Sequence, residues 1–242
     1  MMSDNKITWF ITEVGSAFIY LEPNFNTACV SETIFGESSK ILEIQKNWYL
    51  IECEDGYRGW VHTFYGYKSE KKNKPKFKVV YPDKNGRFSH AQPFGSYINN
   101  FIQGAIPINK TLDIKKINEI TENLLEIPYR WGGKTSLGFD CSGFVQTVLK
   151  VIGFSIPRDS KQQKEFFKEC LIDLKNSCPG DLHFFGTKRK VSHVGLSLGG
   201  YDIIHSQGYV KKESLDKKSK KFNQELFDIY LSTHSIKRKF QY

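Results

Sequence analysis

Cys141 is the residue of this sequence best placed to act as a nucleophile. It follows the glycine-punctuated loop 127–140 and precedes apolar residues at helical spacing, a pattern that Gly153 ends. We therefore expect Cys141 at the first turn of a buried helix, where unpaired N–H groups and the helix dipole favour thiolate over thiol. A buried core thiol is the alternative interpretation, and the polar neighbours Asp140 and Ser142 argue against it.

Two histidines later in the chain are candidates for the base that such a thiol requires. His193 lies in the alternating segment 191–198, and His205 lies in the segment 201–206. A thiol nucleophile needs a base to take its proton and a third group to hold that base in one tautomer. We assign His193 as the base and His205 as the orienting group. Taken singly, each would be interpreted as a hydrogen-bonded structural histidine.

Strand parity restricts how these two histidines can meet. They share one face of a hairpin only if paired positions sum to an even number. A three-residue loop at 198–200 pairs Ser197 with Tyr201, and therefore His193 with His205. A two-residue turn at the glycine pair would place the histidines on opposite faces. We predict the three-residue loop.

Helical patterns precede strand patterns in the second part of the chain, residues 106–242. Amphipathic spacing predicts a helix that begins after Thr111, its expected N-cap, and ends before Pro128. A shorter helix is predicted to begin at Asp159 or Ser160. Alternation then predicts strands near residues 181–185, 191–198 and 201–206, and a last strand around residues 227–231 or beyond. Helices followed by antiparallel strands predict an α+β domain.

The first part of the chain has a different character. Residues 1–67 contain short strand patterns, a tight turn at 54–56 and no helical period, which predicts a small all-β barrel. Residues 68–105 begin as a Lys-rich linker and continue with turn signals, so we expect an irregular extension or an extra hairpin of the first domain. The α+β domain then occupies residues 106–242.

The residues around the candidate nucleophile and histidines resemble the NlpC/P60 family of papain-like cysteine peptidases. The matching segments follow the family's order and are residues 128–133, 139–145, 157–160, 179–182, 192–195 and 204–206. The resemblance implies a papain-like catalytic domain in which Cys141, His193 and His205 form the catalytic set. It implies no metal and no organic cofactor.

The first domain resembles a bacterial SH3-like domain. The residues that carry this resemblance are Trp48, Ile51, Gly56, Gly59 and Trp60. Together the two resemblances imply an α+β papain-like peptidase domain preceded by a small all-β SH3-like barrel.

The family resemblance also implies roles for residues around the nucleophile. Tyr129 is expected to border the oxyanion position and Trp131 to line the substrate groove, although plain packing of the loop would also explain Trp131. Asp140 and Ser142, which flank the nucleophile, are included among the substrate-binding residues. The hydroxyl of Ser142 suits a substrate carboxylate.

Four further residues are expected to bind the ends of the substrate. In the family branch that joins an SH3-like domain to this peptidase domain, the residues matching Asp159 and Ser160 contact substrate. Asp159 suits a free α-amine and Ser160 an α-carboxylate, while capping of the next helix is the alternative. Glu37 and Tyr57 of the first domain are expected to complete the amine pocket; the alternatives are a surface charge and a barrel residue.

The implied activity is hydrolysis of the bond between γ-D-Glu and the diamino acid in peptidoglycan-derived peptides that begin with a free L-Ala. The implied role is recycling of cell-wall peptides. One alternative is an exported peptidoglycan hydrolase tethered to the wall by the SH3-like domain. Others are a non-catalytic cell-wall binding protein and an amidase or acyltransferase on a comparable core.

Composition narrows the cellular setting. The chain has 242 residues and a formal net charge of +9, and no run reaches the ~20 apolar residues of a membrane span. The N-terminus shows no signal peptide, so we expect a cytoplasmic monomer with no membrane partner. The five cysteines form no Cys-x-x-Cys motif, which argues against a zinc site and a disulfide framework. The basic clusters, among them residues 211–221, lack interleaved aromatic residues, so we interpret them as solvated loops and faces and not as a nucleic-acid site.

Overall fold

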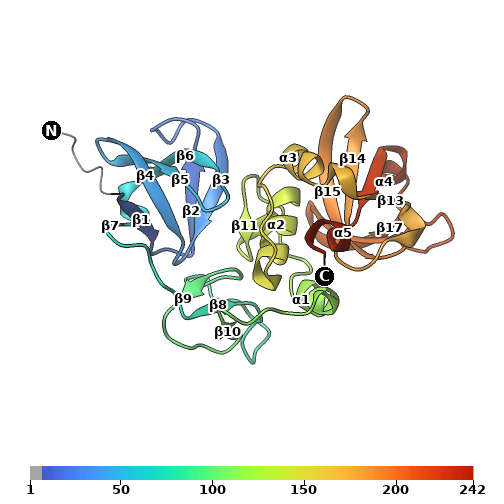
Figure 1. Ribbon diagram of the computed structural model, residues 1–242, viewed down its shortest axis with the longest axis horizontal. Helices are drawn as coiled ribbons and strands as arrows, with labels where there is room; N and C mark the ends of the chain where they lie inside the picture. Colours follow the sequence, from blue (N-terminus) through green and yellow to red (C-terminus); the bar gives the residue numbers. More distant parts are fainter. Residues whose placement is uncertain (1–6, 242) are drawn as a thin grey trace. The chain divides into compact units, whose positions relative to one another are not determined.

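The computed structural model describes residues 7–241, and the chain divides into two compact units (Figure 1). Unit 1 comprises residues 1–110 and 134–137, and unit 2 comprises residues 111–133 and 138–242. Unit 1 is all-β and unit 2 combines helices with an antiparallel sheet, which confirms the predicted fold class.

The first sheet of unit 1 has seven strands in the order β3-β2-β6-β5-β4-β1-β7. Its strands are β1 (Trp9–Thr12), β2 (Ser16–Tyr20), β3 (Cys29–Ile34), β4 (Ser38–Gln45), β5 (Trp48–Glu52), β6 (Arg58–His62) and β7 (Gly66–Ser69), with the 3-10 turn η1 (Thr63–Tyr65) before β7. Alternate residues of these strands bury a core of Phe10, Ala17, Ile19, Ile51, Cys53 and Val61. Burial of one side-chain set per strand is what closes short strands around a common interior.

A second sheet lies in the region expected to be a linker and irregular extension. Three strands, β8 (Phe77–Val79), β9 (Tyr97–Ile98) and β10 (Ala105–Pro107), pair in the order β10-β8-β9. Val79, Ile98 and Ala105 bury one another there. Because these apolar residues are far apart in the sequence, no local alternation of apolar and polar residues predicts the three-stranded sheet.

A buried lysine is part of unit 1. Lys134 opens the short strand β11 (Lys134–Thr135) and is only 3% exposed. Its Nζ lies 4.0 Å from Glu37 Oε2 and 3.9 Å from Asp55 Oδ2, and its backbone N–H donates to Glu32. A buried ammonium requires such carboxylates, because desolvation of an uncompensated charge is costly.

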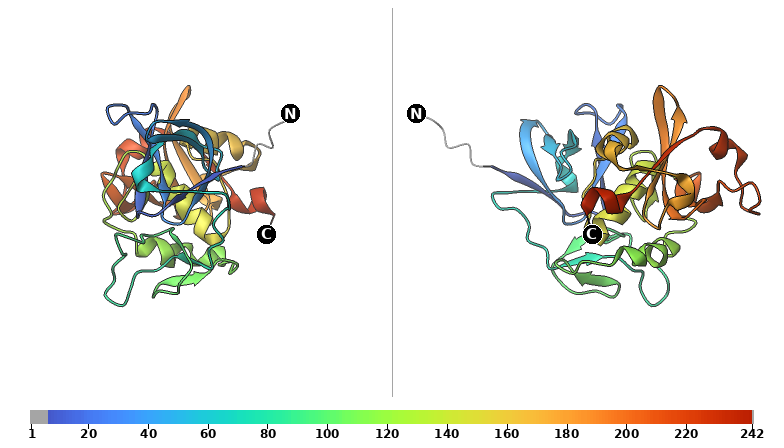
Figure 2. Two further views of the ribbon diagram at one scale, coloured as in Figure 1. Left: turned by 90° about the vertical axis from the view of Figure 1, so that its left-hand side faces the viewer. Right: turned by 45° about the vertical axis from the view of Figure 1, so that its right-hand side comes forward.

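The sheet of unit 2 has six strands in the order β13-β18-β14-β15-β16-β17. They are β13 (Leu171–Ile172), β14 (Leu182–Thr187), β15 (Lys190–Gly199), β16 (Asp202–Gln207), β17 (Tyr209–Ser214) and β18 (Tyr230–His234). The β14–β15 hairpin extends beyond its neighbours (Figure 2). The strand expected around residues 227–231 or beyond forms as β18, after helix α4 (Gln224–Asp228).

The remaining elements of unit 2 are mostly short and helical. They are η2 (Ile114–Lys116), α1 (Ile117–Glu122), β12 (Gly138–Phe139), α2 (Cys141–Ile152), α3 (Ser160–Phe166), η3 (Lys168–Cys170), η4 (Leu174–Asn176) and α5 (Ile236–Phe240). The first helical segment is capped by Asp113, whose side chain accepts from Lys115 N, and not by Thr111 as predicted. Helix α2 packs on β15 and β16, and nearly all of its side chains are buried.

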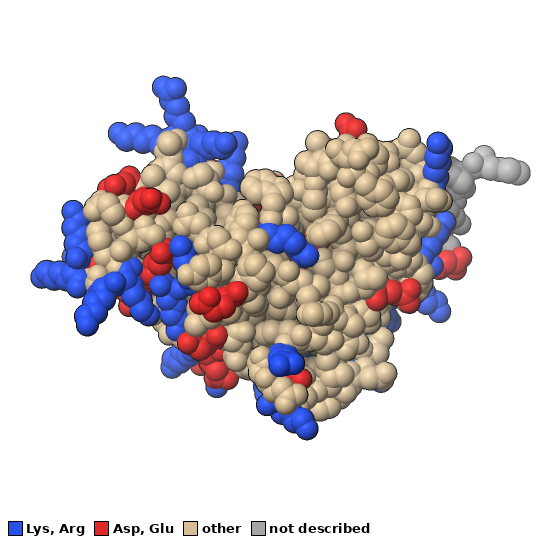
Figure 3. All heavy atoms as spheres, turned by 180° about the vertical axis from the view of Figure 1, so that it is seen from behind, with Lys and Arg blue, Asp and Glu red and all other residues tan. Residues whose placement is uncertain are grey.

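Charged side chains are scattered over the face of unit 2 that Figure 3 shows. Lysines and arginines there are interspersed with Asp and Glu (Figure 3). The exposed basic residues include Lys188, Arg189, Lys217 and Lys218. Within residues 7–241 no helix is long and apolar enough to cross a membrane.

We predict that Glu37→Gln destabilises unit 1. The substitution removes a buried carboxylate that faces Lys134 Nζ, so the free energy of unfolding should fall by about 1–3 kcal/mol. Urea denaturation measures this change, and Glu43→Gln on the exposed part of β4 is the matched control. Equal stability of Glu37→Gln and the control would contradict the inferred role of this ion pair.

Candidate active site

Asp140 organises the start of helix α2, of which Cys141 is the first residue. Its Oδ1 accepts from Gly143 N at 2.7 Å, which caps the helix, and its Oδ2 accepts from Gly132 N at 2.9 Å. Gly143 must be glycine, because an added Cβ would lie 2.1 Å from a carbonyl oxygen of the preceding loop. Both contacts draw the loop onto the helix start, so Cys141 is held in one place.

Arg158 completes this support from the segment before α3. Its guanidinium binds the Asp140 carboxylate with both nitrogens, Nη1 to Oδ1 at 3.0 Å and Nη2 to Oδ2 at 2.5 Å. Nη1 also donates to Ser142 Oγ at 2.9 Å. Arg158 is 2% exposed, so this bidentate pair is shielded from water. Asp140 and Ser142 therefore help to hold the start of α2, and with it Cys141, in place. The substrate contacts predicted for them stay predictions.

Cys141 lies where α2 meets the sheet, as the sequence predicted. The backbone N–H of Val194, the residue after His193, donates to its sulfur. The thiol is only 9% exposed, and burial, followed by the charge of Asp140, raises its pKa to about 11. The expectation of a resting thiolate is therefore wrong, because desolvation outweighs the backbone N–H groups at the helix start.

The two candidate histidines contact each other from neighbouring antiparallel strands. His193 Nε2 and His205 Nδ1 are 2.8 Å apart, and the rings meet edge to face at 81°. Burial lowers the pKa of His193 to about 3 and also lowers that of His205. Both rings are therefore neutral at neutral pH. Because Nε2 of His193 is occupied, its Nδ1 is the nitrogen left to serve a thiol.

The predicted hairpin register is wrong, although the predicted face is right. Leu196 pairs with Ile204, so His193 and His205 are diagonal neighbours and not a directly opposed pair. The ladder shifts between Ser197 and the following glycine, which inserts one extra residue before a two-residue turn. Such a bulge restores even parity, because it moves the bulged strand by one position.

Glu213 is a site residue that sequence reasoning missed. Its Oε2 lies 2.8 Å from His205 Nε2 and accepts from Asn223 Nδ2 at 2.9 Å, while Lys211 Nζ lies 3.2 Å from Oε1. Glu213 lies on β17, within a Lys-rich segment that had been interpreted as a solvated loop. The available signal was the alternation that continues after Gly208, which places 205, 211 and 213 on one face.

Tyr129 lies close to the nucleophile. Burial raises the pKa of Tyr129 to about 12, and the charges of Cys141 and Asp140 add to this effect. Its phenol therefore stays protonated and can donate a hydrogen bond. Trp131, two residues on, is 70% exposed, which makes it available as a wall for a bound ligand.

The other predicted binding residues are divided between the two units. Asp159 precedes α3 without capping it through its side chain, and Ser160 is the first residue of that helix; both are half-buried. Glu37 is buried in unit 1, where it accepts from Ile34 N and faces the ammonium of Lys134. Tyr57 packs against the core of the same unit. Their predicted substrate contacts stay predictions.

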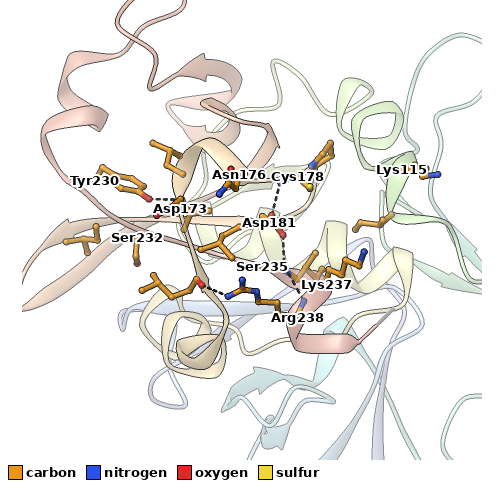
Figure 4. A pocket seen from close by; sticks show the side chains of 18 of the residues that line it. Lys115, Asp173, Asn176, Cys178, Asp181, Tyr230, Ser232, Ser235, Lys237 and Arg238 are labelled. Atoms are coloured by element: carbon orange, nitrogen blue, oxygen red, sulfur yellow. Dashed lines mark hydrogen bonds between the residues drawn. The ribbon is translucent and has the colours of Figure 1, made fainter.

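A separate cavity of about 1130 Å³ lies in unit 2 among β13, η4, β18 and α5 (Figure 4). The buried carboxylate of Asp181 at its edge accepts from Cys178 N and Ile236 N, which fastens α5 to the sheet. Neither Cys141 nor either catalytic candidate histidine lines this cavity. Within residues 7–241 no three His, Cys, Asp or Glu side chains cluster as metal ligands would.

Comparisons with known proteins identify two families along the chain. Residues 126–229 match the model of the NlpC/P60 family, and residues 19–63 match that of the bacterial dipeptidyl-peptidase Sh3 domain. The chain is 29% identical over 216 residues to the γ-D-glutamyl-L-lysine dipeptidyl-peptidase of Bacillus subtilis, a match that covers 73% of this chain and 71% of that protein. It is 37% identical over 109 residues to the probable endopeptidase NlpC of Escherichia coli, covering 43% of this chain and 69% of that protein.

One solved structure is similar over nearly the whole chain. It is an NlpC/P60 endopeptidase from Photobacterium damselae subsp. piscicida, with a TM-score of 0.63 and 15% sequence identity. The match covers 96% of this chain and 72% of that one. At this identity the likeness concerns the fold.

We predict that alkylation of Cys141 by iodoacetamide is slow at neutral pH and accelerates toward pH 11. The reason is that burial keeps the thiol protonated until about 11, while His193 gains a proton only near pH 3, so no ion pair forms between these limits. Peptide mapping by mass spectrometry measures the rate, with the exposed Cys178 as an internal control that reacts faster at pH 7. A fast, pH-independent reaction at Cys141 from about pH 5 to 8 would instead reveal a thiolate–imidazolium pair.

Proposed function

Because this chain belongs to the NlpC/P60 family of cysteine peptidases, we propose that it hydrolyses the γ-D-Glu–diamino acid bond of peptidoglycan stem peptides that carry a free N-terminal L-Ala. The observation that carries the proposal is the joint placement of Cys141, His193 and His205, together with the similarity to a γ-D-glutamyl-L-lysine dipeptidyl-peptidase. The proposed role is recycling of cell-wall peptides.

The resting site is neutral, so proton transfer accompanies attack. The Cys141 sulfur attacks the γ-carbonyl carbon as its proton passes to His193 Nδ1, which gives a tetrahedral intermediate. The C–N bond then breaks, and the imidazolium returns the proton to the departing amine. Water, deprotonated by His193, hydrolyses the remaining thioester and releases L-Ala-γ-D-Glu. Tyr129, protonated and beside the sulfur, is proposed as a donor to the developing oxyanion.

Two groups of the substrate need partners in the protein: its free α-amine needs a carboxylate, and its α-carboxylate needs hydroxyl donors. We assign the free α-amine chiefly to Asp159, a half-buried carboxylate at the start of α3. Ser160 is proposed to contact the α-carboxylate of γ-D-Glu, with Ser142 as a second hydroxyl. Glu37 and Tyr57 stay secondary candidates, because the chain's own Lys134 ammonium already faces the carboxylate of Glu37.

A cytoplasmic monomer remains our proposal for the setting. All five cysteines are free, which suits a reducing compartment. Free stem peptides with an unblocked L-Ala are the product of prior cleavage from the glycan strands. An exported hydrolase tethered to the wall would instead have to accept stems whose L-Ala nitrogen is blocked.

We predict that the enzyme cleaves L-Ala-γ-D-Glu-diaminopimelate and cleaves its N-acetylated form at least about tenfold less efficiently. Loss of a charge-assisted contact of about 1.5–3 kcal/mol corresponds to that range of kcat/KM. Asp159→Asn should lower kcat/KM for the free peptide much more than for the acetylated one. Asp202→Asn, at an exposed position on β16, is the matched control.

Liquid chromatography of the released L-Ala-D-Glu measures both rates. Equal cleavage of the free and acetylated peptides by the intact protein would contradict amine recognition and favour the wall-tethered hydrolase. No cleavage of either peptide would favour a binding protein or a different acyl substrate.

A further inference from the structure

We propose that Glu213 is a positioning residue, which fixes the tautomers of both histidines and so makes Nδ1 of His193 the base that faces the thiol. The inference deepens the proposed function, because it concerns the same site. It rests on a continuous chain of short contacts: His193 Nε2 to His205 Nδ1 at 2.8 Å, then His205 Nε2 to Glu213 Oε2 at 2.8 Å.

The tautomers follow from the donor and acceptor character of each atom. Burial acts to raise the pKa of Glu213, but the hydrogen bonds from His205 and Asn223 and the nearby Lys211 outweigh it and lower the pKa to about 2. The carboxylate is therefore ionised and can only accept. His205 Nε2 must therefore carry the proton. His205 is neutral, so its Nδ1 accepts, and His193 Nε2 must donate. The lone pair of neutral His193 is thereby left on Nδ1.

Asn223 orients the carboxylate that starts this chain of contacts. Its Oδ1 accepts from Leu226 N as the N-cap of α4, which forces its Nδ2 toward Glu213 Oε2. Lys211 Nζ lies beside the other oxygen, Oε1, at 3.2 Å. The charged and titratable groups that face this chain of contacts are therefore His193 on β15, His205 on β16, and Lys211 and Glu213 on β17.

Burial makes the arrangement effective. The His205 side chain is fully buried, and that of Glu213 is 18% exposed. In such surroundings an imidazole with the wrong tautomer would leave a ring nitrogen opposite another acceptor, which is costly. When His193 takes the thiol proton, the Glu213 charge also lies at the far end of the chain of contacts and stabilises the imidazolium.

The test is ¹⁵N NMR of the histidine rings combined with steady-state kinetics of Glu213→Gln. In the wild-type protein both His193 and His205 should show the Nε2–H tautomer. Glutamine can donate as well as accept, so in Glu213→Gln the ring of His205 should become a tautomer mixture. The kcat for the free stem peptide should fall about 10- to 100-fold with KM nearly unchanged, since Glu213 is not among the proposed substrate contacts.

Glu225→Gln, an exposed change of the same type on α4, should behave as wild type. Asn223→Ala separates positioning from stability: it should lower Tm through the lost cap but reduce kcat less than Glu213→Gln does. A wild-type His193 in the Nδ1–H tautomer would overturn the proposal. So would a Glu213→Gln variant with wild-type kcat. Because the tautomers are read without substrate, an inactive wild-type protein would count against the proposed function alone.

Discussion

The buried carboxylate of Asp140 is the contact on which the rest of the site depends. It caps α2 by accepting from the backbone N–H of Gly143, and it also accepts from the N–H of Gly132 and binds the guanidinium of Arg158. These contacts join three separate segments next to Cys141. Removing one partner of such a pair leaves a desolvated charge, which typically costs about 3–5 kcal/mol. The position of the nucleophile is therefore set by an electrostatic requirement that few other residue combinations meet.

Desolvation governs the chemistry as well as the architecture. Burial favours neutral forms of both Cys141 and His193, so the site holds a thiol and an imidazole until substrate arrives. Because no thiolate–imidazolium pair is present in the resting site, catalysis depends on how the His193 ring is oriented toward the thiol. The chain of contacts from His193 through His205 to Glu213 provides this orientation, because each member fixes the hydrogen-bonding role of the next.

Local sequence patterns predicted those features that depend on near neighbours. Cys141 at the first residue of α2 and Gly153 at its end follow from spacing. The shared face of the histidines was expected because catalysis requires it, and their contact agrees with that expectation. The hairpin register did not follow from spacing, because a bulge near Leu198 is decided by packing. Glu213 was missed because its lysine neighbours resemble a solvated loop, and only pairing with β16 shows its inward face. The thiol's pKa depends on burial, which spacing does not report.

The most direct test of the account is the rate at which Cys141→Ala releases L-Ala-D-Glu from L-Ala-γ-D-Glu-diaminopimelate. The account predicts a loss of kcat of at least about 10⁴-fold with an unchanged Tm, since the nucleophile and its base act as one unit. Cys178→Ala, at the exposed cysteine, should retain the wild-type rate. Cleavage by Cys141→Ala at a rate near that of wild type would contradict the assignment of the thiol as nucleophile.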